Sequence, residues 1–382
     1  MKVQNTRPKK YFGKYREPLA AFPNLLETQV SSFKWFLEVG LKEVFQEFSP
    51  INDYSTKKFT LKWDDFTIGE VKTTEEYAKE NKLTYEVPLK ARVSLLNRLN
   101  GQTKEQEIFL TDIPMMTPHG TFIINGVERV LVSQLARSFG VFFTDREAKG
   151  KKFFGAKIIP GRGVWIEIDT EADGVIYVRI DKKRKFPMVS LFRVFGVTDE
   201  KLIEMCQTDE EKEAMALQIA KDPAKSLTES YLEIYKRLRD GDLATPDNAK
   251  EFIDNLFSSE RYDLSTVGRY TFNKRFDKNL TTKDLEKRTI DGEDLYVIWS
   301  HVIKLTNTPQ AKGDDIDHLG SRRVRYVGEM LQAKVRVGMT QIKRNIQDRM
   351  STIDSAQALP IQIINQRPLQ ARIKEFFTTN QL

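Results

Sequence analysis

Three carboxylates within one short stretch have the most suggestive chemical spacing in this sequence. Asp314, Asp315 and Asp317 lie in Gly313–Asp317, which reads GDDID. Clustered carboxylates can hold the paired magnesium ions of enzymes that transfer phosphoryl or nucleotidyl groups. A long helical pattern follows, however, and carboxylates at the start of a helix satisfy its free N–H groups and the positive end of its dipole. We favour this helix-start interpretation and predict no metal site and no catalytic residue.

Other reactive residues lack the partners that chemistry would require. His119, His301 and His318 have no further ligands at metal spacing, and no GxxxxGK phosphate-binding loop is present. Cys206 is the single cysteine, so it cannot form an internal disulfide, and it fits a reducing cytoplasm. No Ser/His/Asp or Cys/His set can be assembled. We therefore expect no cofactor in this segment.

The charge balance is mildly basic, with 61 basic and 54 acidic residues and a net charge of +7. Basic residues cluster at Arg179–Lys185 (RIDKKRK) and Arg322–Arg325 (RRVR), although such clusters are most often solvated faces. A hydrophobic content of 40% argues against disorder. The sequence has no apolar run long enough for a membrane span, and Met1–Tyr11 has no apolar stretch typical of a secretory signal.

The pattern of apolar residues in the first part of the chain predicts one helix followed by strands. Asn24 can cap a helix to about Phe48, with apolar residues three or four apart on one face: Leu26, Val30, Phe33, Leu37, Leu41 and Val44. Strands are expected at 59–63, 83–96 and 106–110. Asn125-Gly126 suits a type I′ turn, which predicts a β-hairpin over 121–134.

The remainder predicts a second group of strands and then helices. Short strands are expected at 156–159, 164–168 and 175–180, and helices near 209–221, 226–238, 247–257 and 293–306. A long helix would follow Asp317 and end near Arg349, and a last one would span 369–377. The apolar stripe of the long helix is Val324, Val327, Leu331, Val335, Ile342 and Ile346.

This order predicts an α+β protein with mixed short β-sheets and packed helices. One domain would be discontinuous, built from both ends of the chain, and a second would be inserted between about residues 137 and 319. The long helix would carry the chain back to the first domain.

Four long stretches resemble the bacterial RNA polymerase beta subunit. They are 22–51 (beginning FPNLLETQV), 111–143 (beginning TDIPMMTPHGTF), 156–196 and 307–336 (beginning NTPQAKGDDIDHLGSRRVR). These stretches occur in the family's order and spread across nearly all of the chain. Such agreement is far more specific than a single short motif.

The resemblance implies that residues 1–136 plus 320–382 form the protrusion and that 137–319 form the lobe inserted into it. In the family, these regions make one jaw of the DNA cleft. The enzyme is a DNA-directed RNA polymerase, a nucleotidyltransferase that makes RNA from nucleoside triphosphates, and aspartates of another subunit hold its Mg²⁺. We therefore expect this segment alone to be inactive, and we expect the natural chain to continue beyond Leu382.

The resemblance also assigns a pocket for an unstacked guanine of the non-template strand. Position by position, Arg137, Asp317 and Arg322 match this pocket. A carboxylate can accept hydrogen bonds from guanine N1–H and N2–H₂, a pair that no other base offers on that edge. Guanidinium groups can stack on the base or bind its phosphate. From the residues alone, surface ion pairs would be the favoured interpretation.

Two further sites are implied by the family. Lys104 and Glu105 match its contact with the transcription-repair coupling factor, although an exposed hairpin edge is an equal alternative. The border of the rifamycin pocket is matched by six residues: Arg129, Val132, Gln134, Arg137, Gln381 and Leu382. Most of that pocket lies beyond Leu382, so we expect this chain to bind the drug poorly.

One residue departs from the family near these sites. Phe139 stands where the family usually has proline between Ser138 and Gly140. Proline would fix φ and stiffen the turn, whereas phenylalanine relaxes the turn and adds bulk. The backbone around Arg137 is therefore expected to differ from that of the family.

The implied partners are DNA, as downstream duplex and non-template strand, the rest of the beta chain, the beta-prime, alpha and omega subunits, sigma factor and the coupling factor. No membrane is implied, and the expected location is cytoplasmic and nucleoid-associated. Two alternatives remain open from the residues. One is a metal nuclease built on the GDDID stretch, and the other is a docking module for transcription factors without useful DNA affinity.

Overall fold

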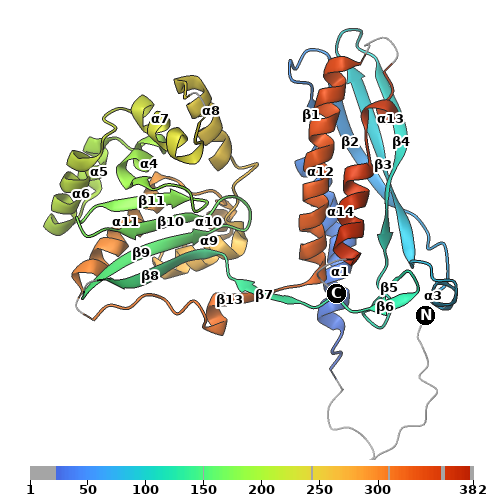
Figure 1. Cartoon of the computed structure of the whole chain (residues 1–382), viewed down its shortest axis with the longest axis horizontal. Coiled ribbons are helices and arrows are strands. Elements are labelled where there is room, and N and C mark those ends of the chain that lie inside the picture. Colours follow the sequence, from blue (N-terminus) through green and yellow to red (C-terminus); the bar gives the residue numbers. More distant parts are fainter. Residues whose placement is uncertain (1–22, 149, 242–243, 309, 354–357, 379–382) are drawn as a thin grey trace, which may run out of the picture. The chain divides into compact units, whose positions relative to one another are not determined.

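The computed structural model describes residues 23–148, 150–241, 244–308, 310–353 and 358–378. The chain divides into two compact units, which are described separately. Unit 1 contains Met1–Gln134 and Val324–Leu382, and unit 2 contains Leu135–Arg323. Both combine helices with antiparallel sheets, so the predicted α+β class is confirmed (Figure 1).

Unit 1 is built on a four-stranded antiparallel sheet with the order β1-β2-β3-β4. The strands are β1 (Ile51–Asn52), β2 (Phe59–Ile68), β3 (Glu86–Asn97) and β4 (Thr103–Pro114). Every second residue of β3 from Val87 to Leu95 is buried, because alternate side chains of a strand point to one face of the sheet. Figure 1 shows α12 (Val327–Thr352) and α14 (Arg367–Thr378) running together beside these strands. Two shorter helices of the unit are α3 (Glu75–Glu80) and α13 (Pro360–Ile363).

The first helix differs from the single regular helix that the periodicity predicts. It consists of α1 (Glu27–Trp35), a π-helical turn (Phe36–Gly40) and α2 (Leu41–Glu47). The wider π turn changes which residues share a face. Leu26 and Val30, which precede this turn, are exposed, and the core contains phenylalanines that the predicted stripe omitted: Phe36, Phe45 and Phe48.

The predicted hairpin forms between β5 (Phe122–Ile124) and β6 (Val127–Arg129). Asn125 and Gly126 both have positive φ, 51° and 78°, as a type I′ turn requires. A Cβ on Gly126 would lie 2.7 Å from the Cα of Lys82, so glycine is also required for space. The second arm ends at Arg129, earlier than predicted.

The long helix begins later than predicted. Residues 310–318 form no helix, Leu319–Ser321 form a 3-10 turn, and Arg322–Arg325 form the strand β13 before α12 begins at Val327. Placing Val324 in the apolar stripe was therefore wrong, because it lies on β13 and is 41% exposed. The other predicted residues are buried on α12, namely Val327, Leu331, Val335, Ile342 and Ile346.

Unit 2 has a five-stranded antiparallel sheet with the order β12-β11-β10-β9-β8. The strands are β8 (Gly140–Ala148), β9 (Lys151–Ile159), β10 (Ile166–Thr170), β11 (Ile176–Ile180) and β12 (Phe186–Pro187). Its helices are α4 (Met188–Val194), α5 (Asp199–Met205), α6 (Asp209–Lys221), α7 (Leu227–Leu238), α8 (Pro246–Phe257), α9 (Ser265–Arg275), α10 (Thr282–Glu286) and α11 (Gly292–Asn307).

A buried ion pair joins two of these helices. Arg269 of α9 and Asp294 of α11 are almost fully buried, with Nη1 and Oδ2 2.9 Å apart. The Arg269 guanidinium also donates to the backbone oxygens of Lys287 and Thr289, and Lys278 contacts the same aspartate. Removing one partner would leave an uncompensated buried charge, so this network fixes α9 in place.

Among the described residues, none of the helices is long and apolar enough to cross a membrane.

A close approach between α12 and α1 generates a test of unit 1. The backbone N–H of Gly328 donates to Oγ of Ser32 over 3.0 Å, and a Cβ on Gly328 would lie 2.1 Å from the Ser32 carbonyl oxygen. Gly328→Ala should lower the free energy of unfolding by about 1–3 kcal/mol through overpacking. Chemical denaturation measures the change. Val337→Ala, at a 46% exposed position of the same helix, should change it by less than about 0.5 kcal/mol. Equal effects would contradict the close-packing explanation.

Candidate nucleic-acid interface

A two-stranded sheet brings together residues that are far apart in the sequence. It consists of β7 (Gln134–Arg137) and β13 (Arg322–Arg325). Next to it, the N–H of Ser138 donates to the carbonyl oxygen of Ser321 over 2.9 Å. This pairing places Arg137, at the end of β7, beside Arg322, at the start of β13.

Asp317 lies in the loop that leads to this pair of strands. Oδ1 of Asp315 accepts hydrogen bonds from the backbone N–H groups of Asp317 and His318, at 2.9 and 3.2 Å. The Asp317 side chain is 82% exposed, and its Oδ1 lies 4.0 Å from Nη2 of Arg322. The carboxylate is therefore close to Arg322 but remains open to a further donor.

Arg137 and Arg322 could both donate hydrogen bonds to a ligand. Both are partly buried, and Nε of Arg322 is buried without a hydrogen-bond acceptor among the described residues. Buried donors without partners are uncommon in native proteins. An arginine presents its donors in a planar fork suited to a base edge, a base face or a phosphate. The three residues of the predicted guanine pocket are thus gathered in one part of unit 2.

Asp314 has a structural role that the sequence analysis missed. It does not start a helix, so the helix-start interpretation was wrong. Its carboxylate accepts from the N–H of Phe143 over 2.7 Å and pairs with both Nη atoms of Arg275, at 2.7 and 2.8 Å. Its own N–H donates to the carbonyl oxygen of Phe143. These contacts attach the loop to β8, and the described part of the chain holds no cluster of three or more His, Cys, Asp or Glu placed to bind a metal.

A second arginine of β13 contacts the residue that departs from the family. The guanidinium carbon of Arg323 lies 3.9 Å from the centroid of the Phe139 ring, which is a cation–π distance. No pattern in the sequence connects these two residues. Their proximity depends on the pairing of β7 with β13, which no local periodicity reveals.

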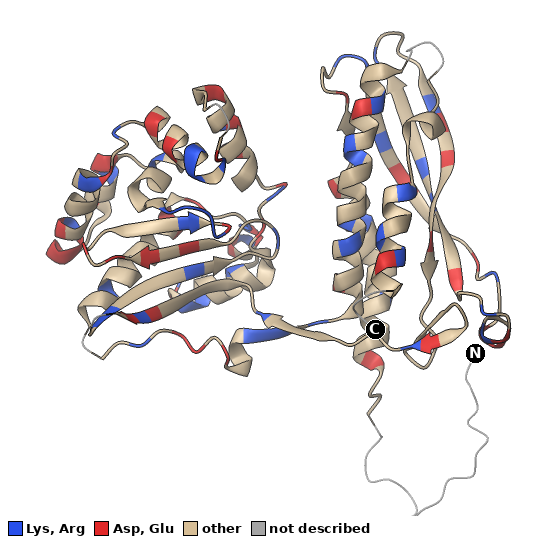
Figure 2. Ribbon diagram, viewed as in Figure 1, with Lys and Arg blue, Asp and Glu red and all other residues tan. Residues whose placement is uncertain are grey.

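Basic and acidic residues are interspersed over unit 2 (Figure 2), and three basic residues of the run 179–185 pair with carboxylates. Arg179, Arg184 and Lys185 pair with acidic residues over 3.5, 3.1 and 2.7 Å, respectively. Lys185 also lies over the Tyr177 ring. A solvated charged face accounts for this cluster, whereas Nε of Arg322 has no acceptor among the described residues.

The residues predicted to border the rifamycin pocket are placed separately. Arg129 donates from Nη1 to the carbonyl oxygen of Phe377 over 3.3 Å, which ties β6 to the end of α14. Val132 is 66% exposed and Gln134 is exposed. Gln381 and Leu382 lie outside the described residues. Arg137 belongs to unit 2, and this pocket stays a prediction.

The predicted coupling-factor contact lies at the start of β4, the last strand in the order of the unit 1 sheet. Lys104 donates from Nζ to the carbonyl oxygen of Ala358 over 3.1 Å, and Glu105 is exposed. Lys104 therefore already has an internal partner. The contact itself stays a prediction.

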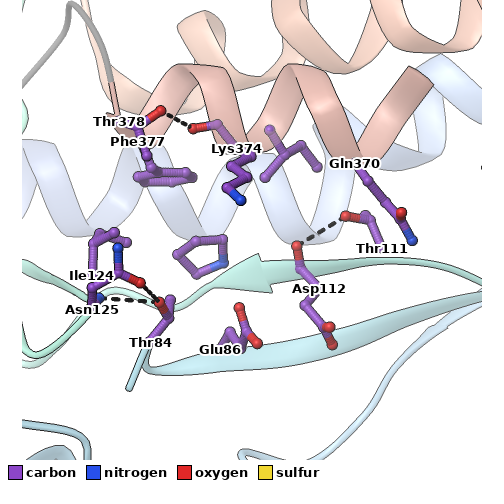
Figure 3. A pocket seen from close by; sticks show the side chains of 12 residues that line it. Thr84, Glu86, Thr111, Asp112, Ile124, Asn125, Gln370, Lys374, Phe377 and Thr378 are labelled. Atoms are coloured by element: carbon purple, nitrogen blue, oxygen red, sulfur yellow. Dashed lines mark hydrogen bonds between the residues drawn. The ribbon is translucent and has the colours of Figure 1, made fainter. Parts of the chain in front are cut away.

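A cavity of about 410 Å³ opens in unit 1 between α14 and the strands (Figure 3). Lys374 and Phe377 line it from the helix, while Glu86 and Asp112 line it from β3 and β4. Burial raises the pKa of the Glu86 carboxyl, the charge of Asp112 raises it further, and Lys72 opposes both effects. None of the predicted site residues that the structure describes lines this cavity.

The raised pKa of Glu86 predicts how stability depends on pH. The folded state holds this proton to higher pH than the unfolded state does, so the ionised carboxylate costs stability at neutral pH. Glu86→Gln should therefore raise the Tm at pH 7. The gain should vanish below about pH 4, where the glutamate is protonated even in the unfolded chain. Thermal denaturation at both pH values, with the exposed Glu70→Gln as control, measures this. A gain of equal size at both pH values would contradict the explanation.

Comparisons with known proteins agree with the resemblance. Residues 137–325 match the family model described as RNA polymerase Rpb2, domain 2. The DNA-directed RNA polymerase subunit beta of Syntrophomonas wolfei subsp. wolfei is 41% identical over 374 residues, which are 97% of this chain. The same match covers 33% of that relative, so this chain spans about a third of the relative's length. On this evidence, the chain belongs to the family of bacterial RNA polymerase beta subunits and corresponds to their N-terminal part.

Proposed function

We propose that this chain forms part of one jaw of the DNA cleft in a DNA-directed RNA polymerase and contacts the non-template strand there. Family membership supports the assignment to the polymerase. The observation that carries the proposed DNA contact is the proximity of Arg137, Asp317 and Arg322, which the pairing of β7 with β13 produces. In this proposal, unit 1 is the protrusion and unit 2 is the lobe.

The chemistry of these three residues suits an unstacked guanine. The exposed carboxylate of Asp317 can accept from N1–H and N2–H₂ of the base, and the cationic Nη2 of Arg322 lies 4.0 Å from its Oδ1. Adenine and the pyrimidines do not offer this pair of donors on the same edge. The guanidinium groups can stack on the base or bind its phosphate. A base can reach such a pocket only when it is outside the stacked duplex.

Catalysis and assembly belong to the whole enzyme in this proposal. Nucleotide addition would take place at Mg²⁺ held by another subunit, and this segment would guide the strand. The rest of the beta chain, beta-prime, alpha, omega and sigma would be its protein partners.

We also propose that the coupling factor binds near Lys104 and Glu105, where β4 lies at the end of the strand order. We do not propose the nuclease alternative, because Asp314 is already bound to Arg275 and to the Phe143 backbone.

Replacing the acceptor tests the proposed guanine contact. In the assembled polymerase, Asp317→Ala should abolish any preference for guanine at the captured position of the non-template strand. One good bidentate base contact discriminates by about 1–3 kcal/mol, so a preference of roughly five- to 150-fold should fall to none. Binding of open-complex DNA that carries each of the four bases at this position measures the preference.

The control is Asp209→Ala, which removes a 97% exposed aspartate elsewhere in unit 2. This variant should retain the preference in full. An unchanged preference in Asp317→Ala would refute the proposed site.

A further inference from the structure

Phe139 is wedged against the body of unit 2. A Cβ on Gly268 of α9 would lie 3.1 Å from the Phe139 Cβ, and a Cβ on Gly161, after β9, would lie 3.5 Å from its ring. Both glycines therefore leave the room that the phenylalanine occupies. The carbonyl oxygen of Phe139 also accepts a hydrogen bond from Oγ1 of Thr271 on α9, over 3.2 Å.

The next residue makes this attachment tight. Gly140 has φ of +132°, and a Cβ there would lie 2.5 Å from Oγ1 of Thr271. The backbone between β7 and β8 is thus joined to α9 immediately after Arg137 and Ser138. Because the buried Arg269–Asp294 pair fixes α9, the position of Phe139 is fixed as well. Other side chains can therefore pack on its ring in a defined geometry.

The side chain of Arg323 packs on the Phe139 ring. Its guanidinium carbon is 3.9 Å from the Phe139 ring centroid, so β13 is held to the segment that follows β7 by a side-chain contact in addition to backbone pairing. Successive side chains of a strand point to opposite faces. With Arg323 held on Phe139, Arg322 must project from the other face of β13, where its Nη2 lies 4.0 Å from Asp317.

We propose that Phe139 and Arg323 form a positioning pair that orients Arg322, and through it Asp317, for base capture. This inference rests on the proposed guanine site. Neither residue touches the base; the stacked pair restricts rotation of β13 and thereby fixes the geometry of the acceptor. The stiffness that proline would give this turn through φ is supplied here by an aromatic ring and a cation.

The test is a double-mutant cycle in the assembled polymerase, with guanine preference and thermal stability both measured. Phe139→Ala and Arg323→Gln should each lower the preference about three- to tenfold, as expected for loss of one cation–π contact. The double variant should lose no more than either single variant, because both remove the same contact. Phe139→Tyr keeps the ring and should keep the preference.

The matched control is Arg325→Gln, which removes another cation of β13, paired with Glu329 rather than with Phe139. It should leave the preference unchanged. If Phe139→Ala is poorly folded, Arg323→Gln and Phe139→Tyr still decide the question.

Three results would overturn the inference. The positioning role fails alone if Asp317→Ala abolishes the preference while Phe139→Ala and Arg323→Gln retain it. It also fails if the fold-loss of guanine preference in the double variant equals the product of the losses in Phe139→Ala and Arg323→Gln, since the two residues would then act independently. If Asp317→Ala itself retains the preference, the proposed guanine site fails, and the positioning role fails with it.

Discussion

The pairing of β7 with β13 is the constraint on which the candidate site depends. Unit 2 is a continuous stretch between two segments of unit 1, so the chain passes between the units twice. The two passages are paired strands, and this pairing is what brings Arg137 beside Arg322. Asp314 secures the approach to β13 by binding Phe143 and Arg275. The position of Asp317 in turn follows from that attachment and from the turn capped by Asp315.

The charge distribution shows why net charge is a poor guide to an interface in this protein. The chain carries a net charge of +7, yet three basic residues of the run 179–185 are paired with acidic neighbours in unit 2. Exposed ion pairs of this kind contribute little to stability. At the candidate site, by contrast, a few residues with unused hydrogen-bonding capacity stand close together. Recognition there would depend on geometry rather than on a broad field.

Features set by neighbouring residues could be predicted from the sequence, and features set by distant contacts could not. The Asn125-Gly126 turn and helix α6 follow from local propensity and are found where predicted. The π turn after Trp35 and the strand at Val324 depend on packing and pairing with remote segments. The same applies to Asp314, whose partners come from β8 and α9. The candidate site residues were named through family resemblance, and their proximity required the fold.

The close approach of Gly328 to Ser32 also has a consequence for the order in which the protein forms during synthesis. The core of unit 1 combines residues from the first segment, such as Phe33 and Leu61, with residues of α12 and α14, such as Leu331 and Phe376. A ribosome completes all of unit 2 before it reaches α12. Unit 2 can therefore fold before α12 and α14 have been synthesised. During that time the β-strands of the first segment are uncovered and can pair incorrectly with other chains. Because unit 2 is synthesised first, the core of unit 1 can close only after the whole of unit 2 has been made.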